Sequence, residues 1–383
     1  MALRQTALAS RSRITSSLSS AACLNSPSAR AYATVGTTTY IGQPPPPPTP
    51  PPAASSSSTT AANLSSVFDA QILYELRRRC QLAPGSSTGS QVQLPKLVEQ
   101  YLDRGGLVLD SSLPYESRPG KDRRIDVDES AALDSVAMIV HAAQQGAEHK
   151  ITHCSGFALS APGLSEGQSV MVTCAHTLEE IRHSPILRRD APPNANNAAL
   201  PSVSGSFVIT GPSSSPTFSP VSSILSSLHR SDLLLMSAPP SPFPALRTLP
   251  VSPYPAQPGA RIRAHFVTHK EPVPGAGAEG WRPWVGGTWS KWIRGTVLGY
   301  RDMAGREAKP GTYDALSHLL FDPTPTPGSS GGPIIDEESG AVIGVVLGTQ
   351  MQNRLQGVCG WGVPSEMIFE MFSLPGLKLN NRS

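Results

Sequence analysis

Residues 327–333 read Pro-Gly-Ser-Ser-Gly-Gly-Pro, and this stretch decides how the rest of the chain is interpreted. It places the Ser330 hydroxyl on a short turn rich in glycine. Gly328 and the two glycines after Ser330 permit backbone conformations that other residues rarely adopt, and they let a substrate backbone come close. Backbone N–H groups around such a turn can point at one place, where the oxyanion of an acyl-transfer reaction is stabilised. The stretch therefore predicts a nucleophilic serine, provided that a histidine and an acid accompany it.

Two earlier stretches supply that histidine and that acid. Residues 170–176 are a β-branched and apolar run that ends at His176, and residues 230–236 place Asp232 at the head of an apolar run. A serine hydroxyl is a weak nucleophile until a base accepts its proton, and a neutral imidazole suits that role near pH 7. A carboxylate then fixes the tautomer of the imidazole. We predict that Ser330, His176 and Asp232 form a catalytic triad.

Each of these residues also has an ordinary structural interpretation. Ser330 could be a turn serine, His176 a core histidine with satisfied hydrogen bonds, and Asp232 a residue that caps a helix or ends a strand. Asp314 and Asp322 are rival acids, both close to the serine in sequence. Because all three motifs occur together in one chain, the catalytic interpretation is favoured over three separate coincidences.

The three motifs resemble those of the trypsin-like serine proteases, which have the chymotrypsin fold. The Thr-Cys-Ala-His stretch is similar to the family's T-A-A-H, and the order histidine, aspartate, serine is the chymotrypsin order. The HtrA/DegP branch is the most similar: Phe321-Asp322, four residues and then 327–333 match its F/T-D-x4-P-G-x-S-G-G-P string. Residues 155–159 and 360–365 resemble its G-S-G-F and G-F-A-I-P-S stretches. The resemblance covers residues 131–372.

The resemblance implies an all-β fold of two six-stranded antiparallel barrels, here preceded by a short helical extension. It also implies that the N–H groups of Gly328 and Ser330 form the oxyanion hole. Thr324, six residues before the nucleophile, matches the floor of the primary substrate pocket, where a threonine favours small or medium apolar side chains. We expect polypeptide substrates and no cofactor or metal. About 19 residues follow Pro364, and we therefore expect none of the PDZ modules that are common in this branch.

The resemblance leaves three functions open. The first is a serine endopeptidase, with mitochondrial protein quality control as a candidate role. The second is a catalytically silent protein of the same fold that binds peptides, which the prolines at 323, 325 and 327 would favour by holding the turn in an unproductive conformation. The third is an esterase-like acyl hydrolase that uses the same residues.

The N-terminal region predicts a targeting sequence and a tether. The first acidic residue is Asp69, and the arginines before it are spread among Ser, Ala and Leu, which is typical of a mitochondrial transit peptide. A secretory signal and a chloroplast transit peptide are the alternatives, and the matrix is favoured over the intermembrane space. The expected organisation is listed here: 1–32 transit peptide, 33–66 disordered Pro/Ser-rich linker, 67–130 partly helical extension, 131–372 protease domain, 373–383 tail.

Composition excludes several other classes. Lys and Arg number 31 against 28 Asp and Glu, with no dense basic stripe, so we expect no nucleic-acid partner. No run approaches the roughly 18 apolar residues of a membrane span. The 5 cysteines lack C-x-x-C spacing, which argues against a zinc site. We expect free thiols in a reducing matrix, with a disulfide between Cys154 and Cys174 as the alternative.

Short apolar runs predict the strands of the two barrels. They are expected at 135–142, 155–160, 169–173, 206–210 and 233–237, and then at 261–267, 292–300, 315–321, 333–336 and 341–348. Helical spacing is expected at 68–80 and 94–102. Residues 194–220, rich in Pro, Ser and Asn, are interpreted as a surface insertion.

Overall fold

The structure is a computed structural model, and it describes most of the chain from residue 59 onward. The described ranges are 59–81, 91–125, 134–162, 168–188, 202–239, 246–273, 275, 279–353 and 357–376. The predicted transit peptide lies outside the described residues, as does the predicted linker up to residue 58. None of the described helices is long and apolar enough to cross a bilayer.

The first half of the folded chain forms a seven-stranded antiparallel sheet. Its order is β5-β4-β1-β2-β3-β7-β6. The strands are β1 Val136–Gln145, β2 Glu148–Leu159, β3 Ser169–Cys174, β4 Ser202–Thr210, β5 Thr217–Pro220, β6 Ser223–Leu228 and β7 Leu233–Ala238. β4 and β5 lie within residues 194–220, so the interpretation of that range as a surface insertion was wrong for its second half. The residues of Ser204–Thr210 are buried in the sheet, and β5 pairs with them as an edge strand.

The second half forms an eight-stranded sheet that closes on itself. Its order is β11-β10-β12-β15-β14-β13-β8, with β9 paired to β10, and a further ladder between β10 and β8 completes a ring of six strands. The strands are β8 Arg261–Thr268, β9 Arg282–Pro283, β10 Trp289–Arg301, β11 Glu307–Ala308, β12 His318–Asp322, β13 Pro333–Asp336, β14 Val342–Asn353 and β15 Gly357–Pro364. This ring is the predicted six-stranded antiparallel barrel.

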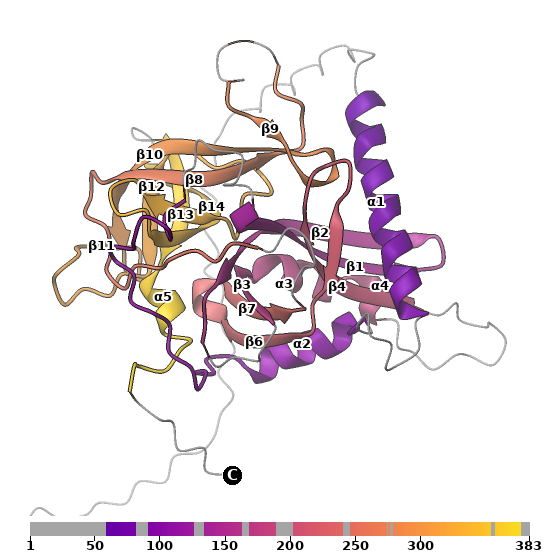
Figure 1. Cartoon of the computed structure of the whole chain (residues 1–383), viewed down its shortest axis with the longest axis horizontal. Coiled ribbons are helices and arrows are strands. Elements are labelled where there is room, and N and C mark those ends of the chain that lie inside the picture. The colour runs from indigo at the N-terminus through magenta and orange to yellow at the C-terminus, as the bar shows by residue number, and fades with distance from the viewer. Residues whose placement is uncertain are drawn as a thin grey trace, which may run out of the picture. The chain divides into compact units, whose positions relative to one another are not determined.

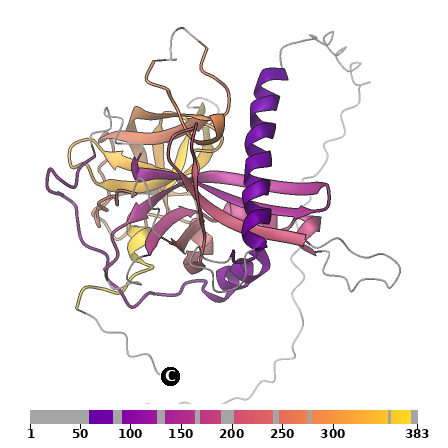
Figure 2. The ribbon, with the colours of Figure 1, turned by 45° about the vertical axis from the view of Figure 1, so that its right-hand side comes forward.

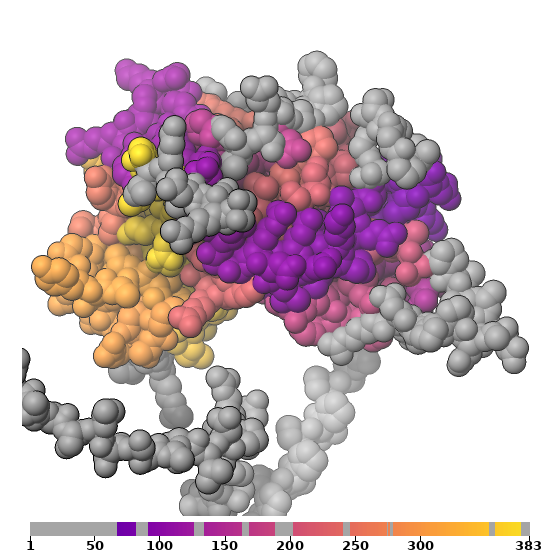
Figure 3. All heavy atoms as spheres, turned by 90° about the horizontal axis from the view of Figure 1, so that it is seen from below, coloured from indigo at the N-terminus to yellow at the C-terminus, as the bar shows by residue number. Residues whose placement is uncertain are grey.

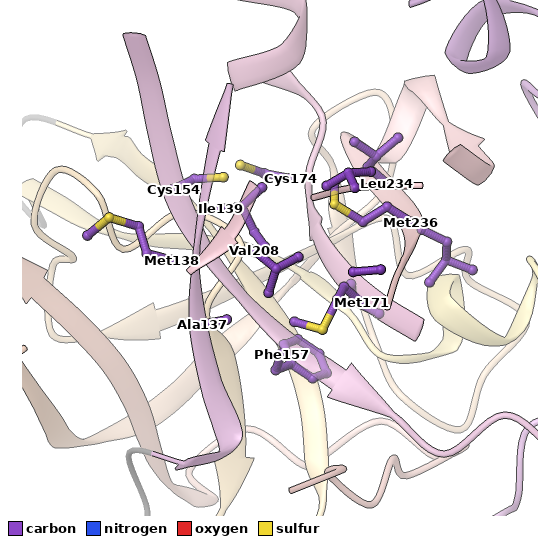
Figure 4. Close-up of a cluster of buried hydrophobic side chains, with 14 of the residues drawn as sticks. Ala137, Met138, Ile139, Cys154, Phe157, Met171, Cys174, Val208, Leu234 and Met236 are labelled. Carbon is purple, nitrogen blue, oxygen red and sulfur yellow. The ribbon is translucent and has the colours of Figure 1, made fainter. Parts of the chain in front are cut away.

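The predicted fold class, all-β with two barrel-like sheets of the chymotrypsin type, is confirmed. The two sheets differ in closure, because no ladder joins β5 to β6 among the described strands and the first sheet is a half-barrel. Its interior is nevertheless packed: Ile139, Phe157, Met171 and Val208 point toward one another (Figure 4) and are almost completely buried. Burying each such side chain contributes roughly 1.5–3 kcal/mol to the stability of the fold. The half-barrel therefore has a stabilising apolar core although its edge strands do not pair.

Two helices precede the barrels. α1 (Thr59–Cys80) runs across the first sheet (Figures 1 and 2) and packs on it through Ile72, Leu73 and Leu76, which are buried. α2 (Leu94–Asp103) buries Leu94, Leu97 and Tyr101, which recur at helical spacing. α1 begins inside the range predicted as linker (33–66), so that boundary is corrected. Once the packed half of a helix is nucleated, adding residues such as the Thr-Thr-Ala-Ala stretch costs little.

The chain after α2 ties the two ends of the fold together. The Leu109 N–H donates to the Met371 carbonyl at 2.9 Å, and the Ser373 N–H donates to the Leu109 carbonyl at 3.0 Å. Seen from below, this N-terminal extension, in indigo to purple, covers part of the first barrel and reaches the yellow C-terminal segment (Figure 3). The remaining helices are short: α3 His176–Arg182, α4 Pro185–Arg188, η2 His229–Ser231, η3 Val285–Gly287 and α5 Glu366–Phe369.

Candidate active site

The ends of two paired strands bring His176 and Asp232 together. β3 and β7 are antiparallel neighbours with Cys174 opposite Leu233, so the residue that follows β3 lies beside the residue that precedes β7. His176 starts α3, and its Nδ1 lies 2.6 Å from Asp232 Oδ2. Because a carboxylate only accepts hydrogen bonds, Nδ1 donates and Nε2 is left free to accept. The pairing of these two residues, predicted from separate motifs, is present in the structure.

Asp232 is held in place through both of its oxygens. Its Oδ1 accepts hydrogen bonds from the backbone N–H of Ala175 at 2.9 Å and of His176 at 2.7 Å. The residue has φ 54°, in the left-handed region that Asp and Asn tolerate best among residues with a Cβ. The rival acid Asp314 lies in an exposed loop, where it accepts from the Lys309 N–H at 3.0 Å. The structure thus places Asp232, and neither Asp314 nor Asp322, against the imidazole.

The environment of His176 favours its protonated form. Burial alone would lower the pKa of His176, but the hydrogen bond and the negative charge of Asp232 together outweigh it, so the pKa is raised above its usual range. The side chain keeps 44% of its surface exposed, so a substrate can reach it. An imidazole with a raised pKa accepts a proton more readily, which is the property that a general base needs.

The serine sits on a turn that is clamped between β2 and β14. The Gly331 N–H donates to the Val346 carbonyl of β14 at 2.7 Å, and the Ser155 N–H of β2 donates to the Ser330 carbonyl at 2.8 Å. Gly331 has φ 82°, and a Cβ atom there would lie 2.1 Å from the Ser155 carbonyl oxygen. Only glycine fits at this position, which explains why the motif has glycine after the serine.

The Ser330 hydroxyl points toward β14 rather than toward the histidine. Its Oγ donates to the Leu347 carbonyl oxygen at 2.8 Å. His176 Nε2 instead lies 3.7 Å from Cys174 Sγ. No hydrogen bond joins Ser330 to His176 in the part of the chain that is described. The structure therefore forms the predicted histidine–aspartate pair and places the hydroxyl of the predicted nucleophile on a carbonyl of β14.

Two backbone N–H groups of the turn have no acceptor. The Ser329 and Gly332 N–H groups donate within the turn, to the Thr326 and Ser329 carbonyls. The N–H groups of Gly328 and Ser330 make no hydrogen bond to any residue that the structure describes. These are the two donors predicted for the oxyanion hole. Gly328 has φ 92°, a conformation that favours glycine.

Thr324 lies at the surface beside β15. Its hydroxyl donates to the Val358 carbonyl at 3.3 Å, and the residue is exposed. The structure thus places it next to β15, the strand that pairs with β14 and so with the strand of Leu347. Its role at the floor of the primary pocket stays a prediction.

Two residues of the site were not identified from the sequence. Ser155 holds the nucleophile turn through its N–H and through its hydroxyl, which donates to the Gly328 carbonyl at 2.9 Å. Leu347 supplies the carbonyl that the Ser330 hydroxyl contacts. The Ser-Gly-Phe stretch at 155–157 was noticed as part of a strand, but a hydrogen bond across 173 residues leaves no local signal. The Leu347 contact is made by the backbone, so its side chain carries no information.

The thiols of Cys154 and Cys174 are free and buried, so the alternative of a disulfide between them is not formed. They point toward one another beside the first-barrel core (Figure 4). Within the described residues, no three His, Cys, Asp or Glu side chains are placed to hold a metal ion.

Replacing Cys174 tests whether its thiol competes with the serine for His176. The contact between Sγ and Nε2 is a weak hydrogen bond that Ser330 must displace. Losing such a bond is expected to raise the rate of Ser330 modification by a fluorophosphonate roughly two- to tenfold in Cys174→Ala. Cys359→Ala, which removes another buried thiol elsewhere, is the matched control. Equal rates in wild type and Cys174→Ala would show that the thiol is only a packing group.

Comparison with known proteins assigns the fold to a family. The family model of the trypsin-like peptidase domain matches residues 154–345, about half of the chain. This range includes all three predicted triad residues. No curated protein sequence matches significantly.

Solved structures give weaker matches. The protease domain of MamO from Magnetospirillum magneticum is 14% identical, with 60% of this chain and 93% of that chain covered and a TM-score of 0.34. An inactive form of Rv3671c from M. tuberculosis H37Rv is 18% identical over 67% and 93%, with a TM-score of 0.34. Deg5 is 15% identical over 60% and 84%, with a TM-score of 0.36. Such similarities are too low to carry function from those proteins. The family model matches half of the chain, and this match shows by itself that the chain belongs to the trypsin-like peptidase domain family.

Proposed function

We propose that this protein is a serine endopeptidase in which Ser330 is the nucleophile, His176 the general base and Asp232 the residue that orients it. The observation that carries the proposal is the 2.6 Å contact between His176 Nδ1 and Asp232 Oδ2, next to a glycine turn with two free N–H groups. A structural histidine–aspartate pair would not need an adjacent turn of this kind. The combination is what acyl transfer requires.

The reaction proceeds in two halves. Ser330 Oγ turns from Leu347 to His176, gives its proton to Nε2 and attacks the peptide carbonyl carbon. The oxyanion receives hydrogen bonds from the N–H groups of Gly328 and Ser330, each of which contributes roughly 2.7–4 kcal/mol of transition-state stabilisation. His176 then protonates the leaving amine, which departs and leaves an acyl ester on Ser330. Water repeats the sequence with the same base and releases the acid.

A second candidate is a catalytically silent protein that binds peptides. The hydrogen bond from Ser330 Oγ to the Leu347 carbonyl favours it, because a hydroxyl held there does not reach the base. One such bond is worth roughly 0.5–1.5 kcal/mol. Contacts between a bound substrate and β14 can offset the loss of this hydrogen bond. The endopeptidase therefore remains the better supported function.

Two assays separate the proposed functions. Wild type is expected to react covalently with a fluorophosphonate and to degrade casein. Covalent reaction without casein cleavage, together with hydrolysis of a p-nitrophenyl ester, would replace the endopeptidase by an esterase-like acyl hydrolase. No covalent reaction, with peptide binding retained, would leave the silent peptide-binding protein.

The raised pKa of His176 predicts the acid limb of the pH profile. Only the neutral imidazole accepts the serine proton, so the second-order rate of fluorophosphonate reaction is expected to rise with pH through the pKa of His176. That pKa lies above the ordinary value because of Asp232. In Asp232→Asn the negative charge is lost, and the midpoint of this limb is expected to move toward lower pH. Stopped-flow or quench rates between pH 5 and 9 measure it, and coincident midpoints in the two proteins would contradict the assignment.

We propose further that the protein works in mitochondria, in the matrix rather than the intermembrane space. The support is the arginine-containing, acid-free N-terminal region. An import assay with isolated mitochondria tests this: we expect potential-dependent processing near residue 32 and protection from external protease. Processing that survives dissipation of the membrane potential, or secretion of the chain, would contradict it.

A further inference from the structure

A pocket of about 210 Å³ lies where α1 meets the two barrels. Its walls come from parts of the chain that are far apart in sequence. They are Phe68, Asp69 and Ile72 of α1, Met138 of β1, His153 of β2, His269 and Lys270 after β8, and the segment 286–288. α1 lies outside the stretch matched by the family model, so this wall is supplied by the N-terminal extension.

The pocket borders the nucleophile turn. A Cβ atom at Gly328 would lie 3.1 Å from His269 Nε2, so this ring rests against the residue that supplies an oxyanion N–H. His269 Nε2 is 2.9 Å from His153 Nε2. His153 in turn is two residues before Ser155, which hydrogen-bonds the turn at Gly328 and Ser330. We therefore expect a polypeptide bound over Ser330 to reach this pocket.

The position of the pocket relative to the turn identifies which part of the substrate it receives. The Ser330 hydroxyl contacts Leu347 of β14, and Thr324 lies beside β15, the strand paired with β14, so these strands mark the side of the predicted primary pocket. His153 belongs to β2, which hydrogen-bonds the turn from the opposite direction to β14 through Ser155, and His269 contacts His153. The primary pocket receives the side chain of the residue whose carbonyl carbon Ser330 attacks. The opposite side therefore receives residues that leave with the amine.

The walls select an apolar side chain. Phe68, Ile72 and Met138 form the apolar part, and the Phe68 ring packs so closely on Gly286 that a Cβ atom there would lie 2.3 Å from it. Burial lowers the pKa of His153 to about 4, so this imidazole is neutral at pH 7. Burial likewise lowers the pKa of His269. A volume below the roughly 300–1,000 Å³ of small-molecule sites suits one side chain rather than a cofactor.

We propose that this pocket binds a large apolar side chain of the substrate on the leaving-group side of the scissile bond, and that Phe68 of α1 sets this preference. The choice of a polypeptide substrate rests on the proposed function. The N-terminal extension then has two roles: α1 completes the substrate cleft, and it covers the first sheet.

The test measures binding in the full-length chain with Ser330→Ala, which removes cleavage. Two fluorescein-labelled peptides carry valine at the primary position and differ only in the next two residues, two leucines or two alanines. Fluorescence anisotropy is expected to give a dissociation constant roughly tenfold lower for the leucine peptide. Adding Phe68→Ala is expected to reduce this ratio to below threefold. Tyr74→Ala is the matched control, because Tyr74 also lies on α1 but is 59% exposed. This variant is expected to keep the ratio.

The ratio of the two dissociation constants separates specificity from folding, because a loss of folded protein weakens the apparent binding of both peptides equally. Circular dichroism verifies folding, and Phe68→Leu, expected to give an intermediate ratio, replaces Phe68→Ala if the latter unfolds. Equal affinity for the two peptides, or a leucine preference that survives Phe68→Ala, would overturn the proposal. Fluorophosphonate reaction of wild type is scored independently. A wild type that does not react, with a Phe68-dependent leucine preference, would reject the proposed catalysis and retain the pocket.

Discussion

Ser330→Ala is expected to abolish covalent reaction with a fluorophosphonate and to lower kcat for peptide hydrolysis by about 10⁶-fold. The reason is that the neighbouring hydroxyl on the turn, that of Ser329, is fully buried and accepts from the Val267 N–H at 2.9 Å, so it cannot replace Ser330. The fold should survive, since the substitution removes one hydrogen bond, to Leu347, and about 1 kcal/mol of stability. Rates come from quenched-peptide hydrolysis and stability from thermal unfolding.

Ser214→Ala is the matched control for this substitution. Ser214 is an exposed serine in the turn between β4 and β5, so its hydroxyl is available to reagents but has no base beside it. We expect its kcat to equal that of wild type. Peptide hydrolysis by Ser330→Ala at more than a hundredth of the wild-type rate would show that another residue is the nucleophile.

Asp232→Asn is expected to lower kcat by roughly 10⁴-fold while the backbone keeps its conformation. Asparagine tolerates the left-handed conformation at φ 54°, and its side-chain oxygen can still accept from the Ala175 and His176 N–H groups. Its amide nitrogen, however, replaces the oxygen that accepts from Nδ1. The imidazole then favours the tautomer with its proton on Nε2, so only the small fraction with Nε2 unprotonated can take the proton of Ser330.

Asp314→Asn serves as the control, because it alters a rival acid that lies in an exposed loop away from His176. Its kcat should match wild type. If Asp314→Asn lost activity and Asp232→Asn kept it, the assignment of the acid would be reversed. Unfolding measured for both variants separates a catalytic loss from a loss of structure.

The barrels could be predicted because their strands are local, apolar and separated by turn residues. The run at Val136–Ala143 is buried throughout, and it was recognised from its composition alone. The strands that were not predicted are β5, β6, β9, β11 and β15, and for β5 and β15 the reason is physical. β5 is a short edge strand with a proline, and β15 alternates glycine with larger residues, so neither has the periodicity of a strand with one buried face.

For the site, the sequence identified residue types and the structure supplied their relations. The histidine–aspartate contact follows from the register of β3 against β7, which no local pattern specifies. The rotamer of Ser330 depends on a backbone carbonyl of β14, and the support from Ser155 depends on a contact between the two barrels. The wall that Phe68 forms could not be predicted, because the extension has no motif and its position is set only by packing.

The proposed mechanism requires that His176 activates Ser330. Peptide mapping of the fluorophosphonate adduct by mass spectrometry tests this most directly. Wild type and His176→Ala are treated in parallel and digested. We predict a single adduct, on Ser330, in wild type and none in His176→Ala over the same time. An adduct on Ser329 or another serine, or equal modification of Ser330 with and without the imidazole, would contradict the proposed mechanism.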